Sequence, residues 1–204
     1  MDKIVLLDKI LKEVNDLRKL KKGYLTNFYL DEFKTTVWIK KDVLFCEKMG
    51  ETVFFIKKNA SFWNVFYSST TLEELQKSLF EFKLKYQNQT VMFDLVGNKE
   101  QCNLVSNVFY QTGFSDYCCL VRMSRIKSMV DDYNDLEQVT YATEEQAKRI
   151  HKILNDYFDP KTEQIPYVEE IIEYAKLHHI LVYMENNEIL GFVIFENNKS
   201  TLYL

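Results

Sequence analysis

The chain contains little glycine and proline: five glycines and two prolines among 204 residues, where average usage is about 7% and 5%. Consecutive glycines stand at least sixteen residues apart, at Gly23, Gly50, Gly97, Gly113 and Gly191. A loop that binds phosphate needs clustered glycines, because these let backbone N–H groups come close to the anion. The sequence therefore excludes a glycine-rich phosphate loop of familiar spacing, and it predicts short linkers.

Metal ligands are also sparse. The cysteines lack the C-x-x-C spacing of zinc and redox sites, so we expect four reduced core thiols: Cys46, Cys102, Cys118 and Cys119. His178 and His179 are adjacent at the start of an expected strand, where their side chains would point to opposite faces. His151 stands alone on an expected helix. The sequence predicts no metal site.

A basic surface and long apolar runs are absent too. The net charge is −4 and the lysines are scattered, which argues against nucleic-acid binding. Asp2, Asp8 and Lys12 interrupt the first apolar stretch, so we expect no signal peptide, and no run is long enough to span a membrane. We expect a soluble, cytoplasmic protein. The lysine-rich, arginine-poor and asparagine-rich composition is typical of an AT-rich bacterial genome.

What the chain does contain is the composition of a globular protein. Hydrophobic residues make up 47% and aromatic residues 15%, enough to bury one complete core and part of another. The polar stretch 124–135 is the one plausible boundary. We therefore predict two domains, residues 1–125 and residues 136–204.

The first predicted domain opens with an amphipathic helix whose apolar stripe is Ile4, Leu7, Leu11, Val14 and Leu17, with no strand before it. Period-two and helical patterns predict the elements that follow. These are a hairpin of strands 43–47 and 52–57 around Met49-Gly50, a strand over 62–67, a helix over 72–86, a strand over 91–96, a helix from the Asn98 cap to Thr112 that Gly113 ends, and a strand over 117–123.

The second predicted domain begins with a short strand at 139–140 and a helix that the capping box Thr143-Glu-Glu-Gln146 opens. Pro166 suits the first turn of a second helix. Three successive strands follow, over 180–184, 188–195 and 200–204, with a hinge at Glu185-Asn186-Asn187 between the first two. The order is strand, helix, helix, strand, strand, strand.

That order, with the segment Asn-Glu-Ile-Leu-Gly-Phe-Val-Ile at 187–194, resembles the opening half of a GNAT-superfamily acyltransferase domain. The segment NVFYQTGFSDYCCLVRM at 107–123 resembles the ending of such a domain. The resemblance implies an α/β fold of the α+β type, with a mixed, mainly antiparallel sheet flanked by helices. It also implies acetyl-coenzyme A as co-substrate and a small-molecule or peptide amine as acceptor in a longer parent protein.

The residues that would carry the family's chemistry are altered. The tyrosine that often protonates the departing thiolate is replaced by Phe109, and Tyr110 lies about 100° further around the helix. The phosphate loop is replaced by Ser-Ser-Thr-Thr-Leu-Glu-Glu at 68–74, in which Glu73 and Glu74 would repel a pyrophosphate. In the second domain the corresponding loop would follow residue 204. We expect a degenerate first domain and the front half of a second.

Two functions remain open. In the first, a longer parent protein is an N-acyltransferase, and this chain alone is inactive and binds no coenzyme A tightly. In the second, the chain is a non-enzymatic binding or regulatory module. No catalytic, cofactor-binding or metal residue is assigned. Glu169, Glu170 and Glu173 lie near the family's acceptor-binding positions, and we interpret them as an exposed acidic helix face. The edge of the strand at 200–204 predicts pairing with a second copy, and hence a homodimer, or pairing with the first domain.

Overall fold

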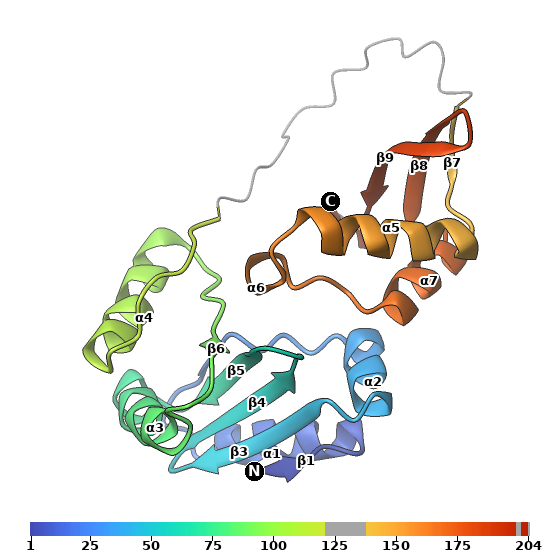
Figure 1. Ribbon diagram of the computed structural model, residues 1–204. Helices are drawn as coiled ribbons and strands as arrows, with labels where there is room; N and C mark the ends of the chain where they lie inside the picture. Colours follow the sequence, from blue (N-terminus) through green and yellow to red (C-terminus); the bar gives the residue numbers. More distant parts are fainter. Residues whose placement is uncertain (121–137, 199–200, 204) are drawn as a thin grey trace. The chain divides into compact units, whose positions relative to one another are not determined.

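The structure, a computed structural model, describes residues 1–120, 138–198 and 201–203. The chain divides into two compact units, residues 1–117 and 118–204. The polar stretch 124–135, where we expected the domain boundary, lies outside the described residues. Helices flank mainly antiparallel sheets in both units (Figure 1), which confirms the predicted α/β class of the α+β type.

The first unit contains helices and strands of very different length. They are β1 (Asp2–Lys3), α1 (Leu7–Lys19), β2 (Leu25–Thr26), α2 (Glu32–Lys40), β3 (Leu44–Met49), β4 (Thr52–Lys58), β5 (Trp63–Ser69), α3 (Leu72–Lys85), β6 (Val91–Met92) and α4 (Lys99–Gln111). The strands form one sheet in the order β1-β3-β4-β5-β2, antiparallel throughout, and β6 pairs in parallel with β5. The predicted hairpin joins β3 to β4, and Gly50 takes the left-handed backbone conformation (φ 55°) that its tight turn needs.

Side chains alternate between the two faces of the sheet along each strand. Both faces carry apolar side chains here, and helices cover both. On one face Phe54, Ile56 and Tyr67 pack against α3 and α4, with Phe54 and Phe82 ring centroids 4.7 Å apart. On the other face Phe55 stacks on Phe28 at 4.5 Å, while Phe66 stacks on Trp38 of α2 at 6.0 Å. Both aromatic layers are almost fully buried, so this unit has a complete core.

The predicted helix ends of the first unit are confirmed. Thr71 accepts the backbone N–H of Glu74 at the start of α3, and Asn98 accepts that of Gln101 at the start of α4. Gly113 follows α4 with φ 80°, as expected of a left-handed C-terminal stop. Lys83 of α3 donates to the carbonyls of Thr112 and Gly113, so α3 also satisfies the end of α4.

Four predictions for the first unit need correction. A strand, β1, does precede the first helix; its two residues are charged and carry no strand pattern. Helix α2 was not predicted, because its β-branched residues disfavour helix and it has no amphipathic stripe. The expected strand over 91–96 stops at Met92. Residues 117–120 form no strand, and the rest of that predicted strand lies outside the described residues.

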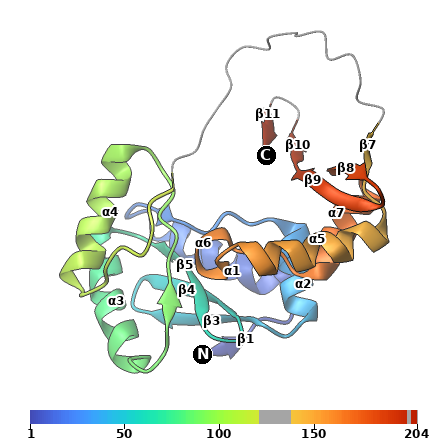
Figure 2. The ribbon, with the colours of Figure 1, turned by 45° about the horizontal axis from the view of Figure 1, so that its top comes forward.

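The second unit contains β7 (Val139–Tyr141), α5 (Glu144–Tyr157), α6 (Pro160–Glu163), α7 (Val168–Lys176), β8 (Ile180–Glu185), β9 (Glu188–Ile194), β10 (Glu196–Asn198) and β11 (Thr201–Tyr203). The capping box at Thr143 is confirmed. Pro166 precedes α7 instead of lying in its first turn, and α6 was not predicted. Strands β7, β8 and β9 form an antiparallel sheet, and α5 lies beside α7 (Figure 2).

The last strand finds a partner within its own unit. β11 pairs antiparallel with β10, with Asn197 opposite Leu202. One edge of β11 is therefore paired without a second copy of the chain or the first unit. The homodimer that we expected from the other edge stays a prediction.

The two units repeat one arrangement. In the first, Ile4 N–H donates to the Leu44 carbonyl and Val43 N–H to the Trp38 carbonyl; in the second, Ala142 N–H donates to Ile180 and His179 N–H to Tyr174. In both units the second residue after the helix that precedes the hairpin is left-handed, with φ 60° at Asp42 after α2 and 56° at His178 after α7. Each unit thus has a short strand that pairs with the first strand of a hairpin. Two longer helices lie between these strands in the sequence, α1 and α2 in the first unit and α5 and α7 in the second, whereas β2 and the four-residue α6 have no counterpart. The duplicated part ends with the hairpin, because the described sheet β7-β8-β9 of the second unit contains no counterpart of β5.

Candidate functional site: the split edge of strand β5

Strand β5 has two different partners along one edge. Near its start, Trp63 and Asn64 pair in parallel with β6, and near its end Ser68 and Ser69 pair antiparallel with β2. Between these two pairings the edge is split, because β6 ends at Met92 while β5 continues. An exposed split of this kind would offer unpaired backbone groups to an extended ligand.

The protein's own chain fills this split. We call residues 23–28, which join α1 to α2 and include β2, the plug. Asn27 donates its backbone N–H to the Tyr67 carbonyl, and its side-chain oxygen accepts the Tyr67 N–H at 2.6 Å. The Asn27 side-chain amide also donates to the Asp94 carbonyl, 2.9 Å away. The Asn27 carboxamide therefore bridges β5 and the chain that follows β6.

Neighbouring side chains secure the plug on both sides of Asn27. The Thr26 hydroxyl donates to the Tyr67 carbonyl at 2.6 Å, and the Tyr24 hydroxyl lies 3.1 Å from that of Ser68. Phe28 turns into the aromatic layer beside Phe55. Asn27 and Phe28 are only 6% and 7% exposed, so the end of the plug is part of the core, whereas Tyr24, Leu25 and Thr26 are half-buried and Gly23 is exposed.

Two ionisable side chains near the split, those of Tyr67 and Asp94, are buried and half-buried. Burial raises the pKa of Asp94 and also that of the Tyr67 phenol. Buried groups of this kind can do acid–base chemistry when a substrate reaches them. Here Asn27 hydrogen-bonds to the backbone of both residues, and these contacts fill the split.

The start of α3, where the phosphate loop of the family is replaced by Ser-Ser-Thr-Thr-Leu-Glu-Glu, is also occupied. Glu51 accepts hydrogen bonds from the Thr70 hydroxyl and from Lys22, which lower the pKa of Glu51 and keep it anionic. Thr71 caps the helix, and Glu74 pairs with Lys77 at 3.1 Å. A helix N-terminus attracts anions, and this one already has carboxylates of the protein itself beside it.

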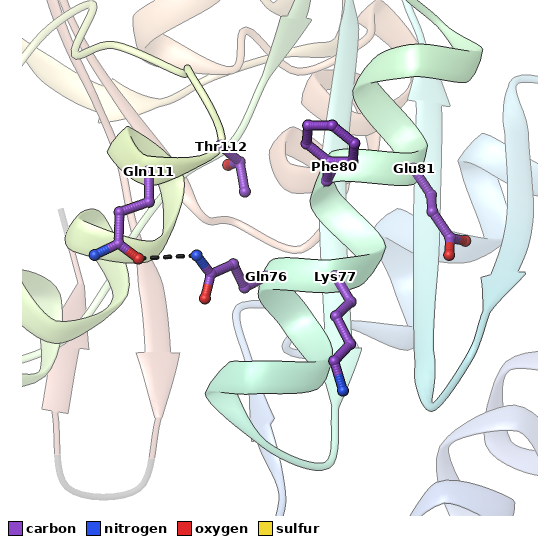
Figure 3. Close-up of a pocket in the computed structure, with 6 residues that line it drawn as sticks. All are labelled: Gln76, Lys77, Phe80, Glu81, Gln111 and Thr112. Atoms are coloured by element: carbon purple, nitrogen blue, oxygen red, sulfur yellow. Dashed lines mark hydrogen bonds between the residues drawn. The ribbon is translucent and has the colours of Figure 1, made fainter.

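A groove of about 370 Å³ lies between α3 and α4 (Figure 3). The side chains of Gln76 and Gln111 point toward each other and share a hydrogen bond of 2.9 Å, which bridges the two helices. Lys77 is paired with Glu73 and Glu74, and Phe80 is 57% exposed. The lining contains no histidine, cysteine or other nucleophile with a neighbouring base, so its chemistry supports contact and not catalysis.

A smaller cavity of about 220 Å³ lies beside β3, lined by Met1, Asp2, Glu13, Cys46, Glu47, Lys48 and Val53. Burial raises the pKa of the Cys46 thiol, which makes it a poor nucleophile. Burial alone would also raise the pKa of Glu47, but hydrogen bonds from Lys85, the Met1 amino group and Tyr86 outweigh it and lower that pKa to about 2. This cavity contains an ion-pair cluster that ties β3 to α3.

The Glu47 cluster predicts a pH-dependent stability. A carboxyl whose pKa is lower in the folded than in the unfolded state stabilises fully above the unfolded value, near 4.5, and progressively less as the pH falls toward 2. We expect the free energy of unfolding to drop across this interval in the wild type and to drop less in Glu47→Gln. Guanidinium titrations at pH 5, 4 and 3, followed by tryptophan fluorescence, would measure it. Equal slopes in both proteins would contradict the assigned pairing.

The positions singled out in the sequence lie apart from one another. Phe109 is buried against Phe93 and Phe114, whereas Tyr110 is 46% exposed, so the two side chains point in different directions, as the helical spacing predicts. The Tyr110 hydroxyl donates to the Asp116 carboxylate. The residues of the plug were missed, because their pairing depends on contacts far along the chain; the one local signal was Gly23.

Two interpretations of exposed and buried groups need correction. Glu170 is buried and accepts the backbone N–H of Tyr167 at 2.7 Å, so it is part of a helix cap and not of an exposed acidic face. Cys118 and Cys119 are exposed and not core thiols.

The two adjacent histidines contact different aromatic rings. His178 packs on Tyr141 and His179 on Phe195. Among the described residues, no three histidine, cysteine or acidic side chains are grouped as metal ligands.

Comparison of the chain with protein-family models, with curated proteins and with solved structures found no match. Over the part of the chain that the structure describes, none of the helices combines the length and apolar character needed to cross a membrane. What defines the class of protein is therefore the fold and its filled site: a two-unit α+β protein with a repeated half-domain.

Proposed function

We propose that the chain is a tandem protein of the acyl-CoA-dependent N-acyltransferase (GNAT) type whose first unit is catalytically silent. Support comes from the repeated order of a strand, two longer helices and a hairpin, and from the later α3-β6-α4 passage of the first unit. In a longer parent, transfer of an acyl group from acetyl-coenzyme A to a small-molecule or peptide amine would depend on the second unit. The first unit would be its scaffold, in a cytoplasmic protein.

The proposal that the first unit is inactive rests on one observation: residues of the protein itself occupy both parts of the place where coenzyme A would bind. A coenzyme A molecule needs convergent N–H donors for its pyrophosphate and an open strand edge for its amide-rich arm. The plug fills the edge through Asn27, and Glu51 lies at the helix start. Both would have to be displaced before the ligand could enter.

A second function follows from the same observation. If the filled site is permanent, the chain serves as a non-enzymatic binding or regulatory module with an acyltransferase-like scaffold. The absence of a paired nucleophile and base around the groove between α3 and α4 favours this alternative for the first unit. Binding of acetyl-coenzyme A and release of free thiol separate the two functions.

The expected result is that this chain neither binds acetyl-coenzyme A tightly nor turns it over. Losing several charge-assisted hydrogen bonds to the diphosphate, at about 1.5 to 3 kcal/mol each, moves a micromolar site to millimolar or weaker. Isothermal titration calorimetry on the full chain measures the affinity, and a thiol-release assay with a panel of amines measures the turnover.

A known coenzyme A-binding acyltransferase, titrated in the same buffer, is the positive control, and near-ultraviolet circular dichroism verifies that the chain is folded. A stoichiometric site of low micromolar affinity would refute the silent first unit. Binding without thiol release would favour a binding module, whereas release with any amine would favour an enzyme.

A further inference from the structure

Two polar side chains, those of Lys57 and Asn64, are buried on the face of the first sheet that carries α2. Lys57 of β4 and Asn64 of β5 are register partners, so their side chains lie side by side. Phe66, two residues after Asn64, points to the same face and stacks on Trp38 of α2. Lys57 and Asn64 are only 3% and 2% exposed. The aromatic layer under α2 therefore borders a buried polar pair.

The indole of Trp38 lies over this pair. Its ring centroid is 4.9 Å from the Lys57 ammonium and 6.0 Å from the ring centroid of Phe66. Lys57 is opposite Asn64, and Phe66 is a same-face neighbour of Asn64 along β5, so the Asn64 side chain lies beside the rim of the indole. Trp38 is 8% exposed. Nitrogen donors from three side chains therefore lie in one buried place.

Two of these donors have no acceptor in the part of the chain that the structure describes. They are Nε1 of Trp38 and Nδ2 of Asn64, and both atoms are buried. The Asn64 side-chain oxygen accepts a hydrogen bond of 2.7 Å from Asn59, which leaves the NH₂ group of Asn64 for another partner. Buried donors without an acceptor destabilise a fold and are rare in native proteins. The two donors therefore indicate that an acceptor binds beside them.

The local charge favours an anion as this acceptor. Lys57 adds a buried ammonium, which a neighbouring negative charge stabilises. The flanking segments, residues 38–43 and 57–64, contain four lysines and one acid, Asp42. The Asp42 carboxylate pairs with Lys3 at 2.6 Å. Positive charge therefore predominates around the two donors.

A carboxylate suits this set of donors. Its two oxygen atoms accept from both N–H groups at once, and hydrogen bonds to a charged acceptor are stronger than neutral ones. The other neighbours are apolar: Phe66, and Leu44 of β3, which is the register partner of Lys57 and fully buried. Sites for small ligands combine apolar walls with a few polar groups in this way. An apolar tail on the carboxylate would contact these walls.

We propose that Trp38, Asn64 and Lys57 form a binding site for a small organic carboxylate. Trp38 Nε1 and Asn64 Nδ2 donate to its oxygen atoms, and the Lys57 ammonium balances its charge. The inference does not depend on acyl transfer, because Asn64 lies near the start of β5 and the plug pairs with Ser68 and Ser69 near its end.

NMR of the indole N–H groups tests the site directly on the isotope-labelled full chain. The chain has two tryptophans, Trp38 and Trp63, and the variant Trp63→Phe assigns their two signals. Titration with sodium propionate at constant ionic strength should shift the Trp38 signal downfield until it saturates, while the Trp63 signal stays in place. Propionamide, the neutral analogue, should bind at least about tenfold more weakly, because its oxygen carries no charge.

Three variants separate the contributions to binding. Lys57→Met removes the charge and keeps the length of the side chain, and it should weaken propionate binding at least about tenfold. Asn64→Leu removes one donor at similar volume and should weaken it too. Lys58→Met is the matched control, because it removes the same charge from the next residue, whose ammonium lies over Phe45 and Trp63. This control should bind propionate like the wild type, and circular dichroism verifies that each variant is folded.

Three results would overturn the inference. A Trp38 signal that propionate leaves unchanged would mean that water satisfies the two donors. Equal binding of propionate and propionamide would mean that the site takes a neutral carbonyl group. Equal loss of affinity in Lys57→Met and Lys58→Met would mean that net charge alone attracts the anion.

Discussion

Replacing Gly23 with alanine is expected to lower the free energy of unfolding of the first unit by about 2 to 5 kcal/mol. Gly23 has φ 131°, a conformation that residues with a side chain rarely adopt, and a Cβ atom there would lie 2.7 Å from the Thr70 carbonyl oxygen. That oxygen belongs to the backbone between β5 and α3 and cannot move aside as a side chain would. The plug would have to shift away from β5.

Tryptophan fluorescence measures this change in the first unit alone, because both tryptophans, Trp38 and Trp63, lie there. Gly97→Ala is the matched control. A Cβ at Gly97 meets only side-chain atoms, at 3.3 Å or more, and its φ is not left-handed, so its effect should stay within about 0.5 kcal/mol. An equally small effect of Gly23→Ala would mean that the plug does not pack against Thr70.

Asn27→Ala is expected to cost about 2 to 4 kcal/mol of unfolding free energy, because the buried Tyr67 N–H and the partly buried Asp94 carbonyl each lose a partner. The carboxamide is the group that bridges β5 to the chain after β6. Urea denaturation, followed by tryptophan fluorescence, gives the midpoint and the slope. An unchanged slope with a lower midpoint would show that stability and not compactness has changed.

Asn103→Ala serves as the control for the loss of an asparagine side chain. Asn103 is exposed on α4, and alanine is the better helix former, so this variant should be neutral or slightly stabilising. If Asn27→Ala were equally neutral, water would be replacing the carboxamide, and the split edge of β5 would be open to solvent. The silent first unit would then lose its main support.

Both predictions bear on the same question, which is whether the site is filled as part of the core. A large loss of stability in both variants would mean that no ligand can enter without unfolding the plug. The acetyl-coenzyme A titration then tests function separately, because stability and ligand affinity are measured on the same wild-type chain.

Local sequence signals predicted most of the elements. The hairpin at Gly50, the capping box at Thr143 and the stop at Gly113 were correct because each depends on residues a few positions apart. Helix α2 was missed because no apolar stripe marks it, although Asp31 caps it. The strand expected over 93–96 does not form, since its edge partner is a side chain, that of Asn27, instead of a strand.

The sequence by itself determined the fold class, the hairpins and helix caps, and the absence of a glycine-rich phosphate loop, because these follow from composition and from short-range periodicity. Only the tertiary structure showed that residues 23–28 fill the edge of β5 and that Glu51 lies at the start of α3. Those contacts join residues about 20 to 70 positions apart, and no local pattern encodes them. The tandem arrangement was expected from the sequence, but the matching backbone hydrogen bonds that relate the two units emerge only from the folded chain.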